Sequence, residues 1–583
     1  MIVLGISGLP DAQKWLKEHY ANIEPLDARI CQGLDSAACI IVDGEIIAAA
    51  SEERFNGVKG TGEFPRQAID YCLRAAGIAE DEVDIIAHGF NYDACRRFFV
   101  SGADKAKFDA IYSSETVIRH FEQAGWSNVR VRFRATDHHY THAVSAFVPS
   151  GFESALCIVA DGMGETESVS IFSCRNGEFE RLDTQTISSS PGIAYSICTR
   201  FLGFMFNSDE YKVMGLAAYG DSQKYSPFFH DFLRFDDETG QILVCWPQGA
   251  LNSAEDGYPG ALSWIQSSTR LASRHAAEEV TQDHADFAAA LQKRFSEMLC
   301  NLALWWLRRS GHSRLCLAGG VFLNCRANQL IASLEEVEDI FIQPASGDDG
   351  SALGAALAHA HSYQTKASFF SPYLGPEYTD QEIQALIAEP QYKQLSFTTL
   401  GYTEEYFASA AQAIRDDLII AWFSGRMEFG PRALGNRSIL ALPSGKEIKE
   451  RINRTVKFRE GFRPFAPAIT DECLDTIFEV KHKSPYRYML STATVKASMA
   501  NVVSGVRHAD GTARTQLVTE QFNPVFYRLL KSVKHSTGHG CVVNTSFNVK
   551  GQPLIMDPRT ALDTFMNTSL DRLYLQGVIV CKR

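Results

Sequence analysis

The sequence predicts an α/β protein whose N-terminal part is a duplicated unit, and three observations lead to this fold class. Apolar runs of strand length open the chain. A strand hairpin follows them, and then a segment with helical apolar spacing. The same order recurs from residue 154 onward. A duplicated unit of this kind places a cleft between its two halves, and 583 residues suffice for about two to four domains.

The first copy of the unit begins at the N-terminus. "MIVLGIS" (residues 1–7) predicts a buried strand, and residues 36–55 predict two strands joined by Asp43-Gly44, a pair typical of type I′ hairpin turns. Residues 65–78 predict a helix because their apolar side chains recur at helical spacing. "VDIIAHG" (83–89) predicts another strand.

The second copy begins with another hairpin-rich stretch, residues 154–183, and helices follow it. Together the two copies resemble the plan of actin-like, sugar-kinase-like ATPase folds. In those folds each half opens with a glycine-rich hairpin that holds nucleotide phosphates. A change of composition ends this part of the chain: residues 362–394 are polar and contain proline, and arginine and lysine become frequent between 426 and 463. We therefore expect two domains, residues 1–365 and 366–583.

Charge and composition exclude several classes of protein. The net charge of −13 argues against a nucleic-acid partner. No run of eighteen apolar residues is present, so no membrane partner is expected. "MIVLGISGLP" lacks a charged region and a cleavage site typical of secretory signals. The fourteen cysteines form no C-x-x-C pair, which excludes a zinc ribbon and favours reduced thiols in a cytoplasmic protein.

The stretch "DHHYTHAVSAF" (137–147) contains the strongest candidate for a metal site. His138 and His142 are four residues apart, so on a helix they share one face and can grip one ion. The pair alone is more often found as polar residues on a solvated helix face. Asp161 and Asp348 each follow an apolar strand and would complete a mixed nitrogen and oxygen set for Fe(II), Mn(II) or Zn(II). Turn aspartates, however, usually only hydrogen-bond the backbone.

Glycines at strand ends indicate nucleotide binding. Gly319-Gly320 follow a strand and lead toward Asn324, and such glycines let a backbone approach a nucleotide closely. Lys212 enters a helix of small residues in a similar way. The alternative at each position is an ordinary tight turn.

These stretches, taken together, resemble the O-carbamoyltransferases of the nodulation-protein-U and antibiotic carbamoyltransferase family. The N-terminal stretches, in the family's order, are "SEERFNGVKG", "DHHYTHAVSAF", "VADGMGE", "EYKVMGLAAYG", "LAGGVFLNC" and "GDDGSALGAA". The C-terminal ones are "SGRMEFGPRALGNRSIL", "VKFREGFRPFAPAI", "RTQLVTE" and "VVNTSFNVKGQPLI". The resemblance covers nearly the whole chain.

The resemblance implies an N-terminal actin-like (ASKHA) domain, which binds metal and nucleotide, and a C-terminal YrdC-like α/β domain. It implies that ATP, with Mg²⁺, and carbamoyl phosphate form a carbamoyl-adenylate in the C-terminal domain. The carbamoyl group then passes to a hydroxyl of a small-molecule alcohol from antibiotic or toxin biosynthesis. The acidic balance suggests a cationic acceptor such as a saxitoxin-type guanidinium alkaloid. The resemblance is also compatible with a homodimer.

The resemblance also implies which residues form the two sites. His138, His142, Asp161 and Asp348 would hold a mononuclear ion, Fe²⁺ ahead of Mn²⁺ or Zn²⁺. The N-terminal nucleotide site would contain Gly162, Gly164, Lys212, Gly319, Gly320 and Asn324. The carbamoyl phosphate and ATP site would contain Arg426, Arg432, Arg437, Lys457, Arg459, Arg463, Arg514, Asn544, Ser546 and Asn548. Guanidinium groups clamp phosphates well, although a run of basic residues is more often a solvated face.

One departure from the family pattern affects the catalytic base. The family carries a histidine before the aspartate of "GLDSAAC", where this chain has Leu34, and residues 10–33 form an insertion before it. Asp35 is the preferred base, and His139 or His19 are alternatives. Two other functions stay open: a non-catalytic, ATP-sensing actin-like scaffold, and carbamoylation of a macromolecule.

Overall fold

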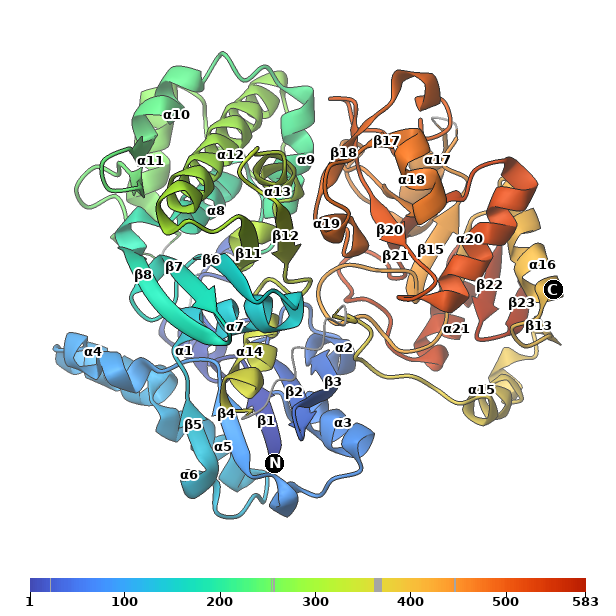
Figure 1. Cartoon of the computed structure of the whole chain (residues 1–583), viewed down its shortest axis with the longest axis horizontal. Helices are drawn as coiled ribbons and strands as arrows, with labels where there is room; N and C mark the ends of the chain where they lie inside the picture. Colours follow the sequence, from blue (N-terminus) through green and yellow to red (C-terminus); the bar gives the residue numbers. More distant parts are fainter. Residues whose placement is uncertain (21–22, 253, 255–256, 361–369, 445–446) are drawn as a thin grey trace. The chain divides into compact units, whose positions relative to one another are not determined.

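The computed structural model describes residues 1–20, 23–252, 254, 257–360, 370–444 and 447–583. The chain forms two compact α/β units (Figure 1). One unit contains residues 1–56 and 60–370, and the other contains residues 57–59 and 371–583. The boundary predicted between residues 365 and 366 lies outside the described residues.

The first unit contains two five-stranded sheets with the same topology. The strands of the first sheet are, in spatial order, β3 (Glu45–Ser51), β2 (Ala37–Val42), β1 (Ile2–Ile6), β4 (Ile85–His88) and β5 (Phe133–Ala135). Those of the second are β8 (Glu178–Thr186), β7 (Glu167–Arg175), β6 (Ser154–Ala160), β11 (Arg314–Ala318) and β12 (Asp339–Ile342). In each sheet the first strand of the copy is central. An antiparallel hairpin lies on one side of it, and two parallel strands lie on the other.

This repeated order confirms the predicted duplication and the actin-like plan of the first unit. Both predicted hairpins form. Asp43 and Gly44 have φ of 49° and 85°, as a type I′ turn requires, and Asn176 and Gly177 repeat this geometry with φ of 52° and 85°. The helix predicted over residues 65–78 is α3 (Arg66–Ala76), which ends at Gly77 in the left-handed conformation.

Two helices, α7 (His138–Ser150) and α14 (Asp349–His359), pack against each other between the sheets (Figure 1). α7 contacts the second sheet and α14 contacts the first. The contacts are close because glycine stands at each crossing: a Cβ on Gly354 would lie 1.9 Å from the Thr141 carbonyl oxygen, and one on Gly5 would lie 2.0 Å from that of Ala352. The two halves of the unit are therefore joined by tightly packed helices.

The other helices surround this core. They are α1 (Ala12–His19), α2 (Glu53–Asn56), α4 (Gly102–Lys107), α5 (Ser114–Gln123), α6 (Val129–Arg132), α8 (Pro191–Phe201), α9 (Glu210–Leu216), α10 (Ser226–Phe232), α11 (Pro259–Thr269), α12 (Gln282–Ser310) and α13 (Cys325–Ala332). A small ribbon of β9 (Leu233–Asp236) and β10 (Gln241–Val244) completes the unit.

The second unit is built on an eight-stranded mixed sheet. Its strands, in spatial order, are β13 (Leu395–Thr399), β23 (Val578–Lys582), β22 (Arg572–Leu575), β14 (Ile420–Phe423), β15 (Arg437–Ala441), β21 (Cys541–Ser546), β16 (Ala466–Thr470) and β20 (Gln516–Val518). A three-stranded sheet contains β17 (Phe478–Glu479), β18 (Thr492–Val495) and β19 (Thr512–Arg514). The helices are α15 (Asp380–Ile387), α16 (Glu404–Arg415), α17 (Glu447–Ile452), α18 (Asp471–Ile477), α19 (Ser484–Arg487), α20 (Pro524–Thr537) and α21 (Pro558–Met566). Apolar clusters cover both faces of the large sheet. This unit is α/β as expected, and its specific likeness to YrdC proteins stays a prediction.

Among the described residues, no helix combines the length and apolar character that a membrane crossing requires. All fourteen cysteines have free thiols, most of them buried.

Candidate functional site

The four predicted metal ligands converge in the first unit. His138 and His142 lie one turn apart on α7, Asp161 follows β6, and Asp348 directly precedes α14. One ligand atom from each of these residues lies within 4.8 Å of all the others. Because β6, β11 and β12 run parallel, the loops at their carboxyl ends meet at one edge of the sheet. That edge faces the start of α7.

Hydrogen bonds orient the first histidine as a metal ligand. Nδ1 of His138 lies 2.9 Å from the Gly89 carbonyl oxygen, so this nitrogen donates and Nε2 is the nitrogen left to bind an ion. Nε2 lies 3.5 Å from Oδ2 of Asp161 and 3.5 Å from Oδ1 of Asp348. Nε2 of His142 lies 3.2 Å from that of His138. Two imidazole nitrogens and two carboxylates therefore point at one buried position, and this donor set suits a divalent transition metal.

The electrostatics of this cluster favour positive charge at its centre. Burial disfavours a charged His138 ring, but the carboxylates of Asp348 and Asp161 outweigh burial and raise its pKa well above the ordinary value. Burial likewise opposes ionisation of Asp161, yet the histidines hold its pKa well below the ordinary range. A metal ion would replace the proton on His138 and satisfy the same carboxylates.

Gly319 and Gly320 act on the metal cluster directly. The Gly320 amide donates to Oδ1 of Asp161 at 2.9 Å. Gly319 has φ of +98°, and a Cβ there would lie 2.2 Å from the Ala160 carbonyl oxygen. These glycines, predicted for nucleotide binding, thus also hold the carboxylate of Asp161 in place.

Gly319→Ala is therefore expected to destabilise the chain by about 3 kcal/mol, because left-handed strain and a backbone clash add up. It should also weaken metal binding roughly 10-fold by turning Asp161. Thermal unfolding and metal titration measure the two effects. The control Gly77→Ala has φ of +67° but open space around the new methyl group, and it should cost only about 1 kcal/mol. Equal effects of the two substitutions would contradict this role of Gly319.

The two candidates for the catalytic base are placed very differently. His139 is fully buried, its Nδ1 lies 2.9 Å from the Ser170 hydroxyl oxygen, and burial holds its pKa well below the ordinary value. Protein encloses this ring, and the role of His139 as an alternative base stays a prediction. The Asp35 side chain is 43% exposed and pairs with Arg29 at 3.6 Å. Asp35 also has φ of +56°, a strained conformation that clusters at functional sites.

The insertion helps to build this site. Gln32 donates to the carbonyl oxygens of Met163 and Gly164 at 2.6 and 2.8 Å, and the Tyr92 hydroxyl donates to Gly164 at 3.1 Å. The turn after Asp161 is therefore held from the insertion side. Within this turn Gly162 has open space around its Cα.

Two other predicted nucleotide residues have protein partners. Lys212 pairs with Asp209 at 2.9 Å. The side-chain oxygen of Asn324 caps α13, and its amide group donates to Gln292 at 3.0 Å. Asn324 is therefore engaged in a structural role that the sequence pattern did not indicate.

Two acids beside the site carry signals that sequence reasoning missed. Burial, followed by repulsion from Asp35, raises the pKa of Asp349 to about 7. Burial also raises the pKa of Glu165 to about 7, although its carboxylate accepts from the His138 amide at 3.1 Å. Asp349 adjoins Asp348 in "GDDG", which was the only sequence signal for it.

In the second unit, two of the predicted phosphate-site residues surround the amine of a third, Lys457. Nζ of Lys457 lies 2.7 Å from Oδ1 of Asn548 and 3.1 Å from Oγ of Ser546, and it also donates to both backbone carbonyls. Burial, with the charges of Arg459 and Arg463, lowers the pKa of Lys457 well below its ordinary value. An anion at this position would restore the charged form.

The remaining predicted residues of this unit fall into two groups. Arg459 stacks on Phe465 at 4.2 Å, and Arg463 lies 3.5 Å from Glu460, both half-buried. Arg426, Arg432 and Arg514 are also half-buried. These five guanidinium groups stay candidates for phosphate binding.

Arg437 and Asn544 differ from the prediction. Arg437 is fully buried, and its guanidinium group donates to the carbonyl oxygens of Ser424, Gly425, Asn436, Met556 and Pro376. Asn544 is 1% exposed and donates to Ala433 and Gln516. Backbone carbonyls accept from the guanidinium group of Arg437, so this arginine has a structural role, and its binding of phosphate stays a prediction.

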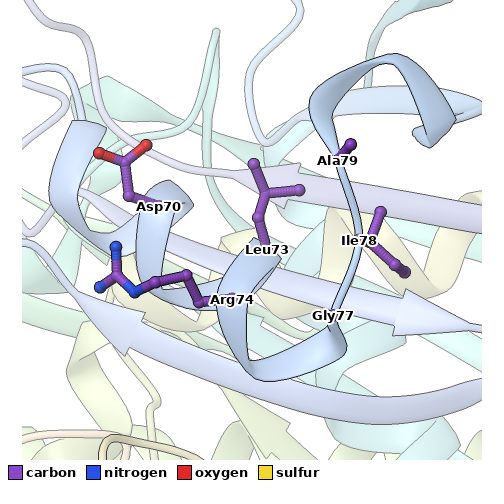
Figure 2. A pocket seen from close by; sticks show the side chains of 6 residues that line it. All are labelled: Asp70, Leu73, Arg74, Gly77, Ile78 and Ala79. Atoms are coloured by element: carbon purple, nitrogen blue, oxygen red, sulfur yellow. The ribbon is translucent and has the colours of Figure 1, made fainter.

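A surface cavity elsewhere in the first unit has no part in this chemistry. It measures about 380 Å³ and lies at the end of α3, lined by Asp70, Leu73, Arg74, Gly77, Ile78 and Ala79 (Figure 2). None of these residues belongs to either predicted site.

Family profiles match both parts of the chain. The profile described as carbamoyltransferase N-terminus matches residues 32–357, and the one described as carbamoyltransferase C-terminus matches residues 411–582. The chain therefore belongs to the carbamoyltransferase family and is a carbamoyltransferase, which confirms the resemblance read from its motifs.

Two curated relatives illustrate this kinship. The chain is 34% identical over 562 residues to nodulation protein NolNO of Sinorhizobium fredii, covering 94% of this chain and 79% of that one. It is 28% identical over 538 residues to the 3'-hydroxymethylcephem-O-carbamoyltransferase of Streptomyces clavuligerus, covering 90% and 92%. Among solved structures, component A of Acidaminococcus fermentans (R)-2-hydroxyglutaryl-CoA dehydratase overlaps 63% of this chain and all of its own, with a TM-score of 0.32 and 14% identity. An overlap of this size carries no argument about function.

Proposed function

We propose that this carbamoyltransferase carries out two successive reactions, one in each unit. In the second unit, water cleaves carbamoyl phosphate to carbamate and inorganic phosphate. A carbamate oxygen then attacks the α-phosphorus of Mg²⁺-bound ATP and expels pyrophosphate, which gives carbamoyl-adenylate. In the first unit, an acceptor hydroxyl attacks the carbamoyl carbon and expels AMP.

The arrangement around Lys457 is the observation that carries the first reaction. Its amine is buried and flanked by Ser546 and Asn548, and it feels the positive charges of Arg459 and Arg463. In the absence of an anion this is an unfavourable place for a lysine. Phosphate groups would pair with the amine and the guanidinium groups and stabilise charge that develops during phosphoryl transfer.

The metal cluster supports the second reaction. His138, His142, Asp161 and Asp348 would hold the ion, and Fe²⁺ is the proposed metal, with Mn²⁺ or Zn²⁺ as substitutes. A bound divalent ion supplies Lewis-acid stabilisation of phosphate oxygens. Asp35 would accept the proton of the acceptor hydroxyl, because its carboxylate is exposed and lies 3.6 Å from Arg29 at the edge of this site. The turn at Gly162 would receive the nucleotide.

The acceptor is proposed to be a small alcohol, and a cationic one is favoured by the net charge of −13. Carbamoylation of a macromolecule and a non-catalytic scaffold are the competing functions. The scaffold is less favoured because it gives no reason to keep a buried amine at Lys457 and the buried ionisable groups of the metal cluster, which are costly without ligands.

The test is product formation with a panel of acceptors. Purified chain, ATP, Mg²⁺ and carbamoyl phosphate are incubated with aminoglycosides, cephem alcohols and guanidinium alcohols, and mass spectrometry looks for a carbamoylated product. AMP should appear in equal amount to that product. Product from neutral acceptors alone would contradict the cationic preference, and AMP without any carbamoylated molecule would contradict the transfer reaction.

Carbamoyl phosphate binding is expected to depend on pH through Lys457. The free protein has a lowered lysine pKa, so binding of an anion takes up a proton, and affinity falls as pH rises through that lowered pKa. Lys457→Arg keeps its charge at all these pH values, so its affinity should stay level until far higher pH. Titration calorimetry in buffers of different ionisation enthalpy measures the proton uptake. Parallel pH profiles of the two proteins would contradict a role of Lys457.

A further inference from the structure

The loop that carries Arg432, residues 430–436, is built on one buried carboxylate. Glu428 is 2% exposed. Its Oε1 accepts from the backbone amides of Leu434, Asn436 and Arg437, at 2.8, 2.8 and 3.2 Å. A single oxygen therefore gathers three amides of the loop, much as a bound anion is gathered by a concave run of backbone amides.

Buried side chains also hold the carbonyl groups of this loop. Asn544 donates to the Ala433 carbonyl at 3.2 Å, and Gln516 donates to that of Leu434 at 2.8 Å. The Tyr373 hydroxyl donates to the same Leu434 carbonyl at 2.9 Å. These donors come from segments far apart in the chain, so the loop has one conformation that the folded second unit fixes.

The end of the loop is fixed as well. The Asn436 side chain donates to the Arg426 carbonyl at 2.6 Å and accepts from Asn523 at 2.8 Å. Gly435 has φ of +102°, and a Cβ there would lie 2.2 Å from the Phe526 ring. By contrast, Pro431 is exposed and Arg432 is half-buried. The polar backbone of the loop is thus tied down while its tip stays accessible.

From this arrangement we propose that Glu428 is a positioning residue for phosphate binding, acting through Arg432. The inference rests on the proposed function, since it takes carbamoyl phosphate as the anion that Arg432 meets. Holding a guanidinium group on a rigid loop removes the entropy that a free side chain and loop would lose on binding. The charge matters too, because an ionised oxygen binds amides more strongly than a neutral one.

Arg437 explains how the buried carboxylate is tolerated. Its guanidinium group is fully buried, feels the charge of Glu428, and holds the carbonyls of Ser424 and Gly425. The two opposite charges therefore fix both ends of the segment 424–437. This role accounts for a fully buried arginine in this motif.

A double-mutant cycle with Glu428→Gln and Arg432→Ala tests the proposal. The readout is the Kd for carbamoyl phosphate, measured by calorimetry on the full chain, with KM and kcat for pyrophosphate release beside it. Arg432→Ala should raise Kd roughly 30-fold. Glu428→Gln should raise Kd about 10-fold in the wild-type background but less than about 2-fold beside Arg432→Ala, because it acts through that arginine.

Glu472→Gln is the matched control, since Glu472 is an exposed carboxylate of the same unit that pairs with Lys531. It should change neither Kd nor kcat. Glu428→Gln keeps one acceptor oxygen for the loop amides and should fold, and Glu428→Ala should raise Kd further.

The outcomes separate this inference from the proposed function. Non-additive effects on Kd, with the melting temperature of Glu428→Gln close to the wild type, support the positioning role. Additive effects, or a Glu428→Gln variant that lowers kcat at unchanged Kd and KM, overturn it. If the wild-type chain binds carbamoyl phosphate but releases no pyrophosphate, adenylate formation alone is rejected. The double-mutant cycle measured in Kd then still tests the positioning role of Glu428. A wild-type chain that binds no carbamoyl phosphate overturns both.

Discussion

Lys457→Ala is expected to lower kcat/KM for carbamoyl phosphate in pyrophosphate release by roughly 10³-fold or more. The substitution removes the buried amine that Ser546 and Asn548 surround, and with it the charge nearest to the proposed phosphate position. Arg459 and Arg463 remain but lose the buried amine whose pKa their charges help to lower. A coupled assay for pyrophosphate measures the effect.

Two controls make this prediction specific. Lys531→Ala removes an exposed lysine of the same unit, paired with Glu472 at 2.7 Å, and should leave the rate unchanged. Metal content of Lys457→Ala should equal that of the wild type, because the metal ligands all lie in the first unit. Wild-type pyrophosphate release by Lys457→Ala would contradict the proposal that the first reaction takes place at Lys457 in the second unit.

Asp161→Ala is expected to have the opposite effect to Lys457→Ala: it impairs metal binding and carbamoyl transfer but leaves pyrophosphate release intact. Bound metal is expected to fall to about a tenth of the wild-type content, because one of four ligands is lost and His138 loses one of its two carboxylate partners. Carbamoyl transfer to an acceptor should become undetectable, while pyrophosphate release that depends on carbamoyl phosphate continues. Elemental analysis and product mass spectrometry measure the two quantities on one preparation.

The control for this prediction is Asp183→Ala, which removes a half-buried aspartate of β8 whose partner is Gln241. It should keep both metal and transfer. Full transfer activity by metal-depleted Asp161→Ala would show that the cluster of His138, His142, Asp161 and Asp348 is not needed for the second reaction.

Local signals in the sequence predict much of this fold. The Asp43-Gly44 and Asn176-Gly177 turns fix two hairpins, because each pair adopts the positive φ that a type I′ turn needs. The spacing of His138 and His142 predicts a shared helix face, and α7 provides it. These features depend on neighbours in the chain, which a pattern can show.

Features that depend on distant partners could not be predicted in this way. Arg437 sits in a motif full of arginines, yet backbone carbonyls from residues 376, 424 and 556 surround it. Asn324 looks like a nucleotide residue, but Gln292 on α12 engages it. Glu428 and Asp349 stand out only once burial and their surroundings are known. In each case long-range packing decides which partner a polar side chain meets.

Pyrophosphate release from ATP by the wild-type chain, followed with and without carbamoyl phosphate and in the absence of any acceptor, tests the central claim most directly. The account predicts release that requires carbamoyl phosphate and Mg²⁺ and that stops in Lys457→Ala. Folded, metal-loaded protein that releases no pyrophosphate, or that releases it equally without carbamoyl phosphate, would contradict adenylate formation as the first step.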